Sequence, residues 1–222
     1  MRVLDVAAGD GNAAVEAVRA GAEAVASDFA PLQVEQGRAR VAAEGLDIEW
    51  VEADAEELPF EDASFDAAVS VFGAMFAPRP ERAAAELFRV VRPGGTVAMA
   101  NWRPESFSAR MFEVMNRYRP EEPAGLVPSS LWGAEDTVRE RFGPYSDDVS
   151  VEASSVTWRF ESLQAMAEFF QSSGPRQSSV PEEKRGALLQ ELLDLVNEHN
   201  DADDGSVSIR GAFSIVVARK RS

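Results

Sequence analysis

Two acidic residues and a small-residue loop near the N-terminus have the types and spacing of a nucleoside-binding site. Asp5 lies inside a short apolar run that breaks into the sequence AAGDGN, and Asp28 closes the next apolar run. Glycines after a strand let a ligand approach the backbone closely, and the following helix presents free N–H groups. A carboxylate such as Asp28 can accept both hydroxyl groups of a ribose. The pattern therefore indicates a ligand that contains a ribose.

Residues after the later apolar runs extend this pattern to a base. Phe29 offers an apolar face beside Asp28. Asp54 can accept a hydrogen bond from an exocyclic amine, and the N–H of Ala55 can donate to a ring nitrogen. Asp5 is expected to brace the loop by accepting from its backbone N–H groups, or to bind a ligand amine through water. Together these residues predict an adenosine site.

Alternating strand and helix patterns must position these residues. The apolar runs predict strands over 2–7, 23–28, 48–53, 65–71 and 96–101. Helices are expected to begin at Asn12, Pro31 and Pro80, and Pro93-Gly94-Gly95 is expected to end the third. Such alternation predicts an α/β fold with a doubly wound, mostly parallel sheet. In such a sheet ligands bind at the carboxyl ends of the strands, where the strand order reverses.

In the second half of the chain, strand and helix patterns no longer alternate regularly. Residues 103–132 predict an irregular or short-helical insertion, and helices are expected over 135–143, 161–172 and 182–199. Strands are expected over 149–160 and 211–220, and should pair antiparallel to complete a seven-stranded sheet. We expect one domain over 1–222, with a cofactor-binding core at 1–102 and insertions at 103–132 and 161–205 that cover an acceptor site.

Two cofactor classes compete for the first loop. The sequence GDGNAA fits the dinucleotide-binding fingerprint, and Asp28 lies near the expected distance for a ribose-binding acid. That reading favours an NAD(P)-binding oxidoreductase. However, a pyrophosphate over the loop would face the negative charge of Asp5, and a dinucleotide does not need the Asp54-Ala55 pair. A ligand with an ammonium, a sulfonium and adenosine, but no phosphate, fits better, which favours S-adenosylmethionine (SAM).

Four ordered sequence blocks make this interpretation more specific. They are VLDVAAGDGN, ASDFAP, VEADAEELPFEDASFDAAVSVFGAMFA and ELFRVVRPGGTVAMANW, and they cover roughly residues 2–102. With these blocks the chain resembles the class I SAM-dependent methyltransferases (methyltransferase types 11 and 25), in the branch of ubiquinone- and menaquinone-biosynthesis enzymes. The resemblance implies a Rossmann-like methyltransferase fold, SAM as cofactor, and methyl transfer by in-line displacement to a small apolar or aromatic acceptor.

The resemblance also implies roles for individual residues. Cofactor-binding roles fall on Asp5, Ala7, Gly9, Gly11, Asp28, Phe29, Asp54, Ala55, Val71 and Phe72. Among these, the first four surround the methionine moiety, and the backbone near Val71 faces its ammonium. Ala7 stands where the family usually has a glycine. Family members usually have N-terminal helices that help enclose the cofactor, whereas this chain begins at its first strand, so a non-catalytic SAM-binding or partner-binding protein is an alternative.

The acceptor side of the site is less defined by the sequence. Aromatic residues that could line an acceptor pocket are Phe76, Trp102, Phe107, Trp132 and Phe170. No residue is identified as a catalytic base, and a phenolate or enolate acceptor would need none. The one histidine, His199, continues an apolar helical stripe and is interpreted as packing at a helix end. No metal site is expected.

Composition excludes several other classes of function. With 222 residues, 45% of them hydrophobic, the chain can form a full-sized core. Its formal net charge of -16 disfavours nucleic acid as a partner. The absence of cysteine excludes disulfides and thiolate chemistry, and no apolar stretch is long enough to cross a bilayer. We expect a cytoplasmic bacterial protein, a monomer or homodimer, whose partner is a small-molecule acceptor.

Overall fold

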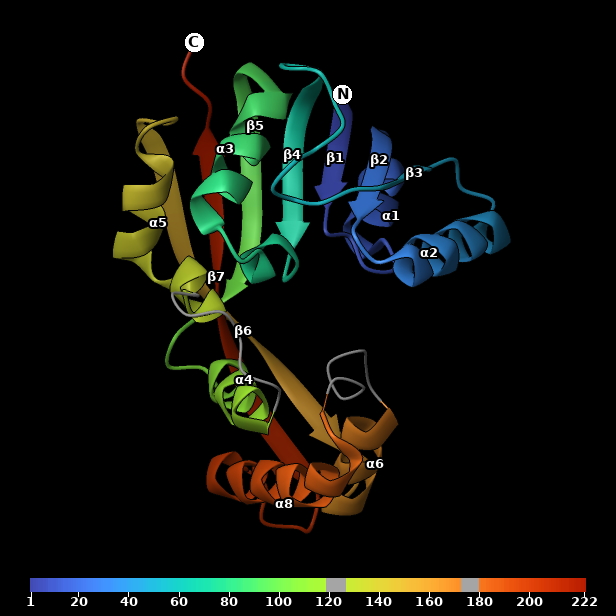
Figure 1. Cartoon of the computed structure of the whole chain (residues 1–222), viewed down its shortest axis with the longest axis vertical. Coiled ribbons are helices and arrows are strands. Elements are labelled where there is room, and N and C mark those ends of the chain that lie inside the picture. The colour runs from blue at the N-terminus through green and yellow to red at the C-terminus, as the bar shows by residue number, and fades with distance from the viewer. Residues whose placement is uncertain (119–126, 173–179) are drawn as a thin grey trace. The chain divides into compact units, whose positions relative to one another are not determined.

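The computed structural model describes residues 1–118, 127–172 and 180–222 (Figure 1). Its first half alternates strands and helices as the sequence predicts. The elements in order are β1 (Arg2–Val6), α1 (Asn12–Arg19), β2 (Glu23–Asp28), α2 (Pro31–Glu44), β3 (Glu49–Glu52), β4 (Phe65–Val71), the 3-10 turn η1 (Ala74–Phe76), α3 (Pro80–Val90) and β5 (Val91–Trp102).

The second half adds helices and two long strands. These elements are α4 (Phe107–Tyr118), the 3-10 turn η2 (Ser129–Gly133), α5 (Glu135–Phe142), β6 (Asp148–Phe160), α6 (Leu163–Ser172), α8 (Glu182–His199) and β7 (Val207–Arg219). Within the described part of the chain, no helix is both long enough and apolar enough to cross a membrane.

The strands form one seven-stranded sheet in the order β3-β2-β1-β4-β5-β7-β6. Strands β1 to β5 pair in parallel, and β5, β7 and β6 are antiparallel neighbours, so the predicted fold class is confirmed. The connections through α1 and α3 run outward in opposite directions from the centre of the sheet. Because such crossovers are right-handed, these two helices cover opposite faces. The strand order reverses between β1 and β4, which is where this topology places a ligand site.

Small residues and one tryptophan form the core between the first two helices and the sheet. The buried members of this cluster are Ala14, Val15, Ala24, Ala26, Val34, Val41, Ile48 and Trp50. Gly37 in α2 allows the close contact, because a Cβ atom there would lie 2.1 Å from the Trp50 ring. The ring thereby packs α2 directly onto β3.

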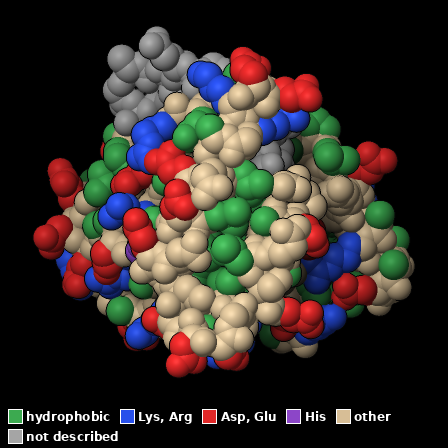
Figure 2. Space-filling model, turned by 90° about the horizontal axis from the view of Figure 1, so that it is seen from below, with side chains coloured by type: hydrophobic (Ala, Val, Ile, Leu, Met, Phe, Trp, Pro, Cys, Tyr) green, Lys and Arg blue, Asp and Glu red, His purple; other side chains and the backbone are tan. Residues whose placement is uncertain are grey.

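The chain divides into two compact units. Unit 1 comprises Met1–Asn101, Val127–Glu152 and Ser214–Ser222. The described part of unit 2 comprises residues 102–118, 153–172 and 180–213. Unit 2 has its own core, in which α4, α6 and α8 pack around residues such as Phe107, Met166 and Leu192. The surface in Figure 2 carries scattered acidic and basic side chains and hydrophobic ones near its middle. Basic side chains do not gather into a patch on this face.

The largest differences from the sequence prediction lie in β5, in β7 and in the 103–132 insertion, and other boundaries shift by one or two residues. Strand β5 begins at Val91, before Pro93-Gly94-Gly95, because a register shift between Phe65 and Ala67 lets the strand carry this irregular segment. Strand β7 begins at Val207, four residues before the predicted start. The 103–132 insertion contains the regular helix α4, and its residues 119–126 lie outside the described residues, as do residues 173–179 of the second insertion.

Candidate functional site

The carboxyl ends of the first four strands meet at one edge of the sheet, and backbone contacts join the loops that follow them. The N–H of Ala8 donates to the carbonyl of Ser27 at 2.9 Å, and the N–H of Ala53 donates to the carbonyl of Asp28 at 3.0 Å. The loop after β4 approaches so closely that a Cβ atom on Gly73 would lie 2.2 Å from the carbonyl oxygen of Ala7. The predicted cofactor residues therefore belong to one contiguous group of loops within unit 1.

The loop after β1 depends on unusual backbone angles. Gly9 and Gly11 have φ angles of 60° and 87°, and Ala7 has a φ of 53° despite its Cβ atom. An alanine in this left-handed region is strained by roughly 1–2 kcal/mol. Gly11 is also buried against the Trp50 ring, where an added Cβ atom would lie 2.6 Å from a ring carbon. The loop is thus held in one shape by tight packing below it.

Asp28 connects the first loop to the second. Its Oδ2 accepts from the N–H of Gly9 at 2.8 Å, and its Oδ1 accepts from the N–H of Ala30 at 3.0 Å. The two bonds hold the carboxylate in place. Because the residue is only 6% exposed, little water competes for them. Ala30, not Asp28, occupies the N-cap position of α2. Each oxygen retains a second acceptor position, so the carboxylate can still receive two hydroxyl donors.

Asp5 lies beneath the first loop and is 1% exposed. Its Oδ2 accepts from the N–H of Ala14 in the first turn of α1 at 2.9 Å, so the observed donor belongs to the helix after the loop and not to the loop itself. Burial raises the pKa of Asp5 from 3.8 to about 7, and the charges of Asp28 and Asp10 add to the increase, whereas the Ala14 bond opposes it. Two carboxyl groups therefore lie at the root of one loop, and Asp5 carries its negative charge mainly above about pH 7.

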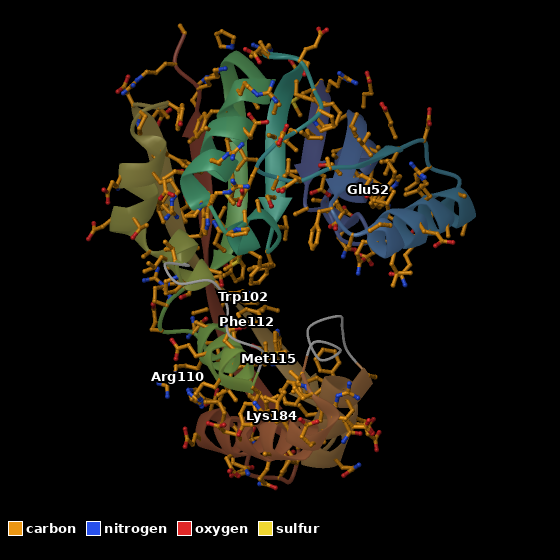
Figure 3. All side chains as sticks on the ribbon, in the orientation of Figure 1. Glu52, Trp102, Arg110, Phe112, Met115 and Lys184 are labelled. Carbon is orange, nitrogen blue, oxygen red and sulfur yellow. The ribbon has the colours of Figure 1, made fainter. Side chains whose placement is uncertain are left out.

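A tight turn follows β3, which ends at Glu52 (labelled in Figure 3). The Oδ1 of Asp54 accepts from the N–H of Glu56 at 2.9 Å, and its carbonyl accepts from the N–H of Glu57 at 3.0 Å. Neither bond uses the N–H of Ala55. Asp54 is exposed, so its carboxylate and the Ala55 N–H can both meet a ligand at this edge.

Two apolar residues border the site on its solvent side. Phe29 is 73% exposed and Val71 is 48% exposed, at the ends of β2 and β4. Phe72 has a φ of 54°, a strained angle for a bulky residue at a strand end. Large exposed apolar side chains beside fixed polar groups are typical of a ligand-binding surface.

Sequence reasoning missed two polar residues at these strand ends. Ser70 is fully buried in β4, where its Oγ donates to the carbonyl of Val6 at 2.8 Å and accepts from the N–H of Ala74 at 2.8 Å. Glu56 is 2% exposed although its acidic neighbours are exposed. A lone serine in an apolar run and an acid in an acidic run carry no local signal of these roles.

The five aromatic residues predicted for the acceptor pocket fall into both units. Phe76 and Trp132 belong to unit 1, and Trp102, Phe107 and Phe170 belong to unit 2. Trp132 is 1% exposed, and its ring contacts Phe142 and the guanidinium of Arg141. Phe107 and Phe170 are buried in the unit 2 core. Trp102 is the last residue of β5, and Phe112 and Met115 belong to α4 (all three are labelled in Figure 3). The acceptor role of all five stays a prediction.

The remaining candidate groups have structural contacts. The Nδ1 of His199 lies 3.0 Å from the carbonyl oxygen of Leu195, one helical turn earlier, and its ring lies 5.7 Å from that of Phe107. This placement agrees with a helix-end packing role. Among the described residues, no group of acidic or histidine side chains could hold a metal ion.

Comparisons with known proteins identify the family of the chain. The family model described as "Methyltransferase domain" matches residues 4–99. An uncharacterised protein of Mycobacterium tuberculosis is 38% identical over 196 residues, 87% of this chain and 72% of that protein. A second one is 46% identical over 156 residues, 70% of this chain, and here the match spans 57% of the relative's length. A demethylmenaquinone methyltransferase of Clavibacter sepedonicus is 41% identical over 101 residues, 46% of this chain and 41% of that enzyme.

Solved structures share the fold at low sequence identity. The YcgJ protein from Bacillus subtilis matches with a TM-score of 0.69 and 17% identity, over 100% of this chain and 92% of that one. Phosphoethanolamine N-methyltransferase 2 of Haemonchus contortus, in complex with SAM, matches with a TM-score of 0.61 and 18% identity, over 100% of this chain and 49% of that one.

Proposed function

Because this chain belongs to the family of class I SAM-dependent methyltransferases, we propose that it transfers a methyl group from SAM to a small apolar or aromatic acceptor. The observation that carries the proposal is the pair of buried carboxyl groups, Asp5 and Asp28, at the root of the first loop. An acidic loop root suits a cofactor with positive charge and no phosphate. The alternative NAD(P) reading requires a pyrophosphate over this same loop.

The residues present fit SAM by their donor and acceptor chemistry. The carboxylate of Asp28 would accept the ribose hydroxyl groups while its bonds to Gly9 and Ala30 hold it fixed. Phe29 would flank the adenine ring, and the Asp54-Ala55 turn would pair with its edge. These roles, together with those of Ala7, Gly11, Val71 and Phe72 near the methionine moiety, are part of the proposal.

The protein's chemical task in such a reaction is mainly alignment. When bound, SAM supplies a methyl group that its sulfonium already activates for in-line attack. Holding two reactants in line can lower a barrier by roughly 7–11 kcal/mol in the best cases. The rigid loops around Asp28 and Gly11 would hold the cofactor end of this arrangement. No base is assigned, since a phenolate or enolate acceptor arrives ionised.

Calorimetry with S-adenosylhomocysteine tests the cofactor class. We expect the protein to bind S-adenosylhomocysteine and not NAD or NADP, and the reverse result would favour the oxidoreductase reading. Replacing Asp28 by alanine should weaken binding by about 1.5–3 kcal/mol, since a charged hydrogen-bond acceptor is lost. Unchanged affinity in that variant would remove Asp28 from the ribose site.

Turnover separates an enzyme from a non-catalytic relative. Methyl transfer from labelled SAM to a panel of quinols and phenols should yield a labelled product with this chain. If the chain binds S-adenosylhomocysteine but neither this panel nor an amine panel is methylated, the SAM-binding, non-catalytic alternative is favoured. Methylation of amines alone would replace the proposed acceptor class.

A further inference from the structure

Glu56 is a buried carboxylate inside an acidic and otherwise exposed segment. Its side chain is 1% exposed, whereas Asp54 and Glu57 on either side are exposed. Burying an ionised carboxylate is costly unless hydrogen bonds and opposite charge compensate for the lost water. The burial of Glu56 must therefore be compensated by its contacts, and these contacts restrict the position of the backbone around it.

Both oxygens of Glu56 bind Arg79, the residue that precedes α3. Oε1 accepts from the backbone N–H of Arg79 at 2.6 Å, and Oε2 accepts from its Nε at 2.5 Å. Two bonds to one residue fix the direction of the carboxylate as well as its distance. Because Arg79 is the N-cap of α3, the turn after β3 is attached to the start of the helix that follows β4.

The same residue also anchors the other side of the turn. The backbone N–H of Glu56 donates to Oδ1 of Asp54, so the carboxylate that faces the base is attached to the residue whose side chain binds Arg79. The Ala55 N–H lies between these two anchored residues. A shift of the Glu56 side chain would therefore displace both groups that are proposed to meet the base edge.

We propose that Glu56 is a positioning residue whose bonds to Arg79 hold the Asp54-Ala55 pair in register with adenine and so set the discrimination against other purines. The inference rests on the proposed SAM function. Adenine presents an amine donor and a ring-nitrogen acceptor, whereas hypoxanthine presents a carbonyl acceptor and an N–H donor. An acceptor at Asp54 and a donor at Ala55 distinguish the two bases only if both are held in place.

A neighbouring contact provides a matched control. Glu86 in α3 accepts from the N–H of Leu58 at 2.7 Å, so it attaches the same loop to the same helix just beyond the turn. A merely structural role for Glu56 predicts that Glu56→Gln and Glu86→Gln act alike. A positioning role predicts that only Glu56→Gln alters base discrimination.

The experiment measures binding of three probes to the whole chain by calorimetry. S-adenosylhomocysteine reports total affinity, its deaminated analogue S-inosylhomocysteine reports the base edge, and 5′-methylthioadenosine lacks the amino-acid end. In Glu56→Gln one oxygen is replaced by a donor that faces Arg79 Nε. We expect its preference for adenine over hypoxanthine to fall about tenfold, which is the loss of one well-placed charged hydrogen bond. The ratio between the two adenine probes should stay the same, and so should base preference in Glu86→Gln.

A second variant keeps the test valid if Glu56→Gln does not fold. The Arg79 side chain is 60% exposed, so Arg79→Lys replaces the directed Nε bond by a freely rotating ammonium, keeps a positive charge for the buried carboxylate and leaves the backbone bond intact. This variant should lower the preference for adenine over hypoxanthine about threefold, which is less than Glu56→Gln does. Unchanged preference in a folded variant, or an equal loss in Glu86→Gln, would overturn the inference. Absence of all binding in the unmodified protein would instead refute the proposed function.

Discussion

The two compact units of this protein are stabilised in different ways. In unit 1, the loops at the candidate site depend on left-handed backbone angles, at Ala7, Gly11 and Phe72 among others. In the described part of unit 2, the only residue with such an angle is Gly205. The core of unit 2 consists of packed aromatic and aliphatic side chains. It includes Phe107, whose ring lies 5.8 Å from that of Trp158.

Buried charge follows the same division. Asp5, Asp28 and Glu56 are buried acids of unit 1, whereas the buried polar residues within the described part of unit 2 are the serines Ser106 and Ser108. Strained backbone and buried charge each oppose folding and persist where the surrounding structure enforces them. We infer that strained backbone and buried charge at the site lower the stability of unit 1, whereas unit 2 is stabilised mainly by side-chain packing. Substitutions in each unit should therefore have different effects on stability and on cofactor binding.

The largest expected effect is loss of stability in unit 2. Phe107 is 2% exposed in the unit 2 core, so Phe107→Ala should lower the free energy of unfolding by about 3–5 kcal/mol. Chemical denaturation measures this change. Affinity for S-adenosylhomocysteine should change less than about twofold, because the cofactor residues belong to unit 1. A folded Phe107→Ala protein with cofactor affinity reduced tenfold would contradict the division.

The next effect concerns Asp5 and depends on pH. Its folded-state pKa, about 7, is above the ordinary value of 3.8, so the unfolded state releases this proton more readily. The stability contributed by the protonated form is complete below pH 4, decreases as the pH rises to about 7, and is constant above that. Asp5→Asn removes this dependence and can still accept from Ala14 N–H, so it should raise the free energy of unfolding at pH 8 by as much as about 4 kcal/mol.

A pair of denaturation series at pH 4 and pH 8 checks the Asp5 prediction. The gain in Asp5→Asn should be large at pH 8 and small at pH 4. Asp10→Asn provides the control, because Asp10 is exposed and pairs with Arg40 on the surface. It should change stability by less than about 1 kcal/mol at either pH. An equal gain for Asp5→Asn at both pH values would show that the buried charge is not the cause.

Much of unit 1 could be predicted from the sequence because its signals are local. The apolar runs and the glycine-rich turn define each strand end, and the topology then brings Asp28 to the loop that contains Gly9, as the 2.8 Å contact shows. Glu56 could not be predicted, because an acid among other acids gives no sign of burial. The contact of Gly11 with Trp50 was also invisible, because the two residues are distant in sequence.

The second half of the chain was harder to predict for a related reason. Prolines between residues 103 and 132 suggested irregular structure, but none lies within α4, which therefore forms a regular helix. Whether Phe107 belongs to a core or to a pocket depends on contacts with β6 and α8, which no local pattern encodes. The aromatic character of a residue therefore does not by itself distinguish a core position from a pocket position.

The backbone contribution to the site can be measured with two glycines of matched angle. Gly11 and Gly21 have φ angles of 87° and 86°, but only at Gly11 would an added Cβ atom meet a neighbour, the Trp50 ring. Gly21→Ala should lower the free energy of unfolding by about 1 kcal/mol through backbone strain. Gly11→Ala should lower it by about 3 kcal/mol, because overpacking against the ring is added.

Binding measurements on the same two variants connect this strain to the site. Affinity for S-adenosylhomocysteine should fall in Gly11→Ala and remain unchanged in Gly21→Ala, since only the first lies in the loop bonded to Asp28. Similar stability losses in both variants would show that the Trp50 ring moves aside easily. The proposed rigidity of the loop would then be wrong.

The smallest expected effect is a loss of unfolding free energy at Glu191, which, like Glu56, binds an arginine. In unit 2, Glu191 of α8 bonds to Arg117 of α4, but its side chain is 37% exposed, whereas that of Glu56 is 1% exposed. Water and salt screen an exposed pair, so Glu191→Gln should lower the free energy of unfolding by about 0.5 kcal/mol or less, and added salt should abolish the difference. Glu56→Gln should cost more at any salt concentration, because its new amide donor faces the Arg79 Nε donor at a buried position. Equal costs and equal salt dependence would mean that burial, on which the contrast between the units rests, does not control these interactions.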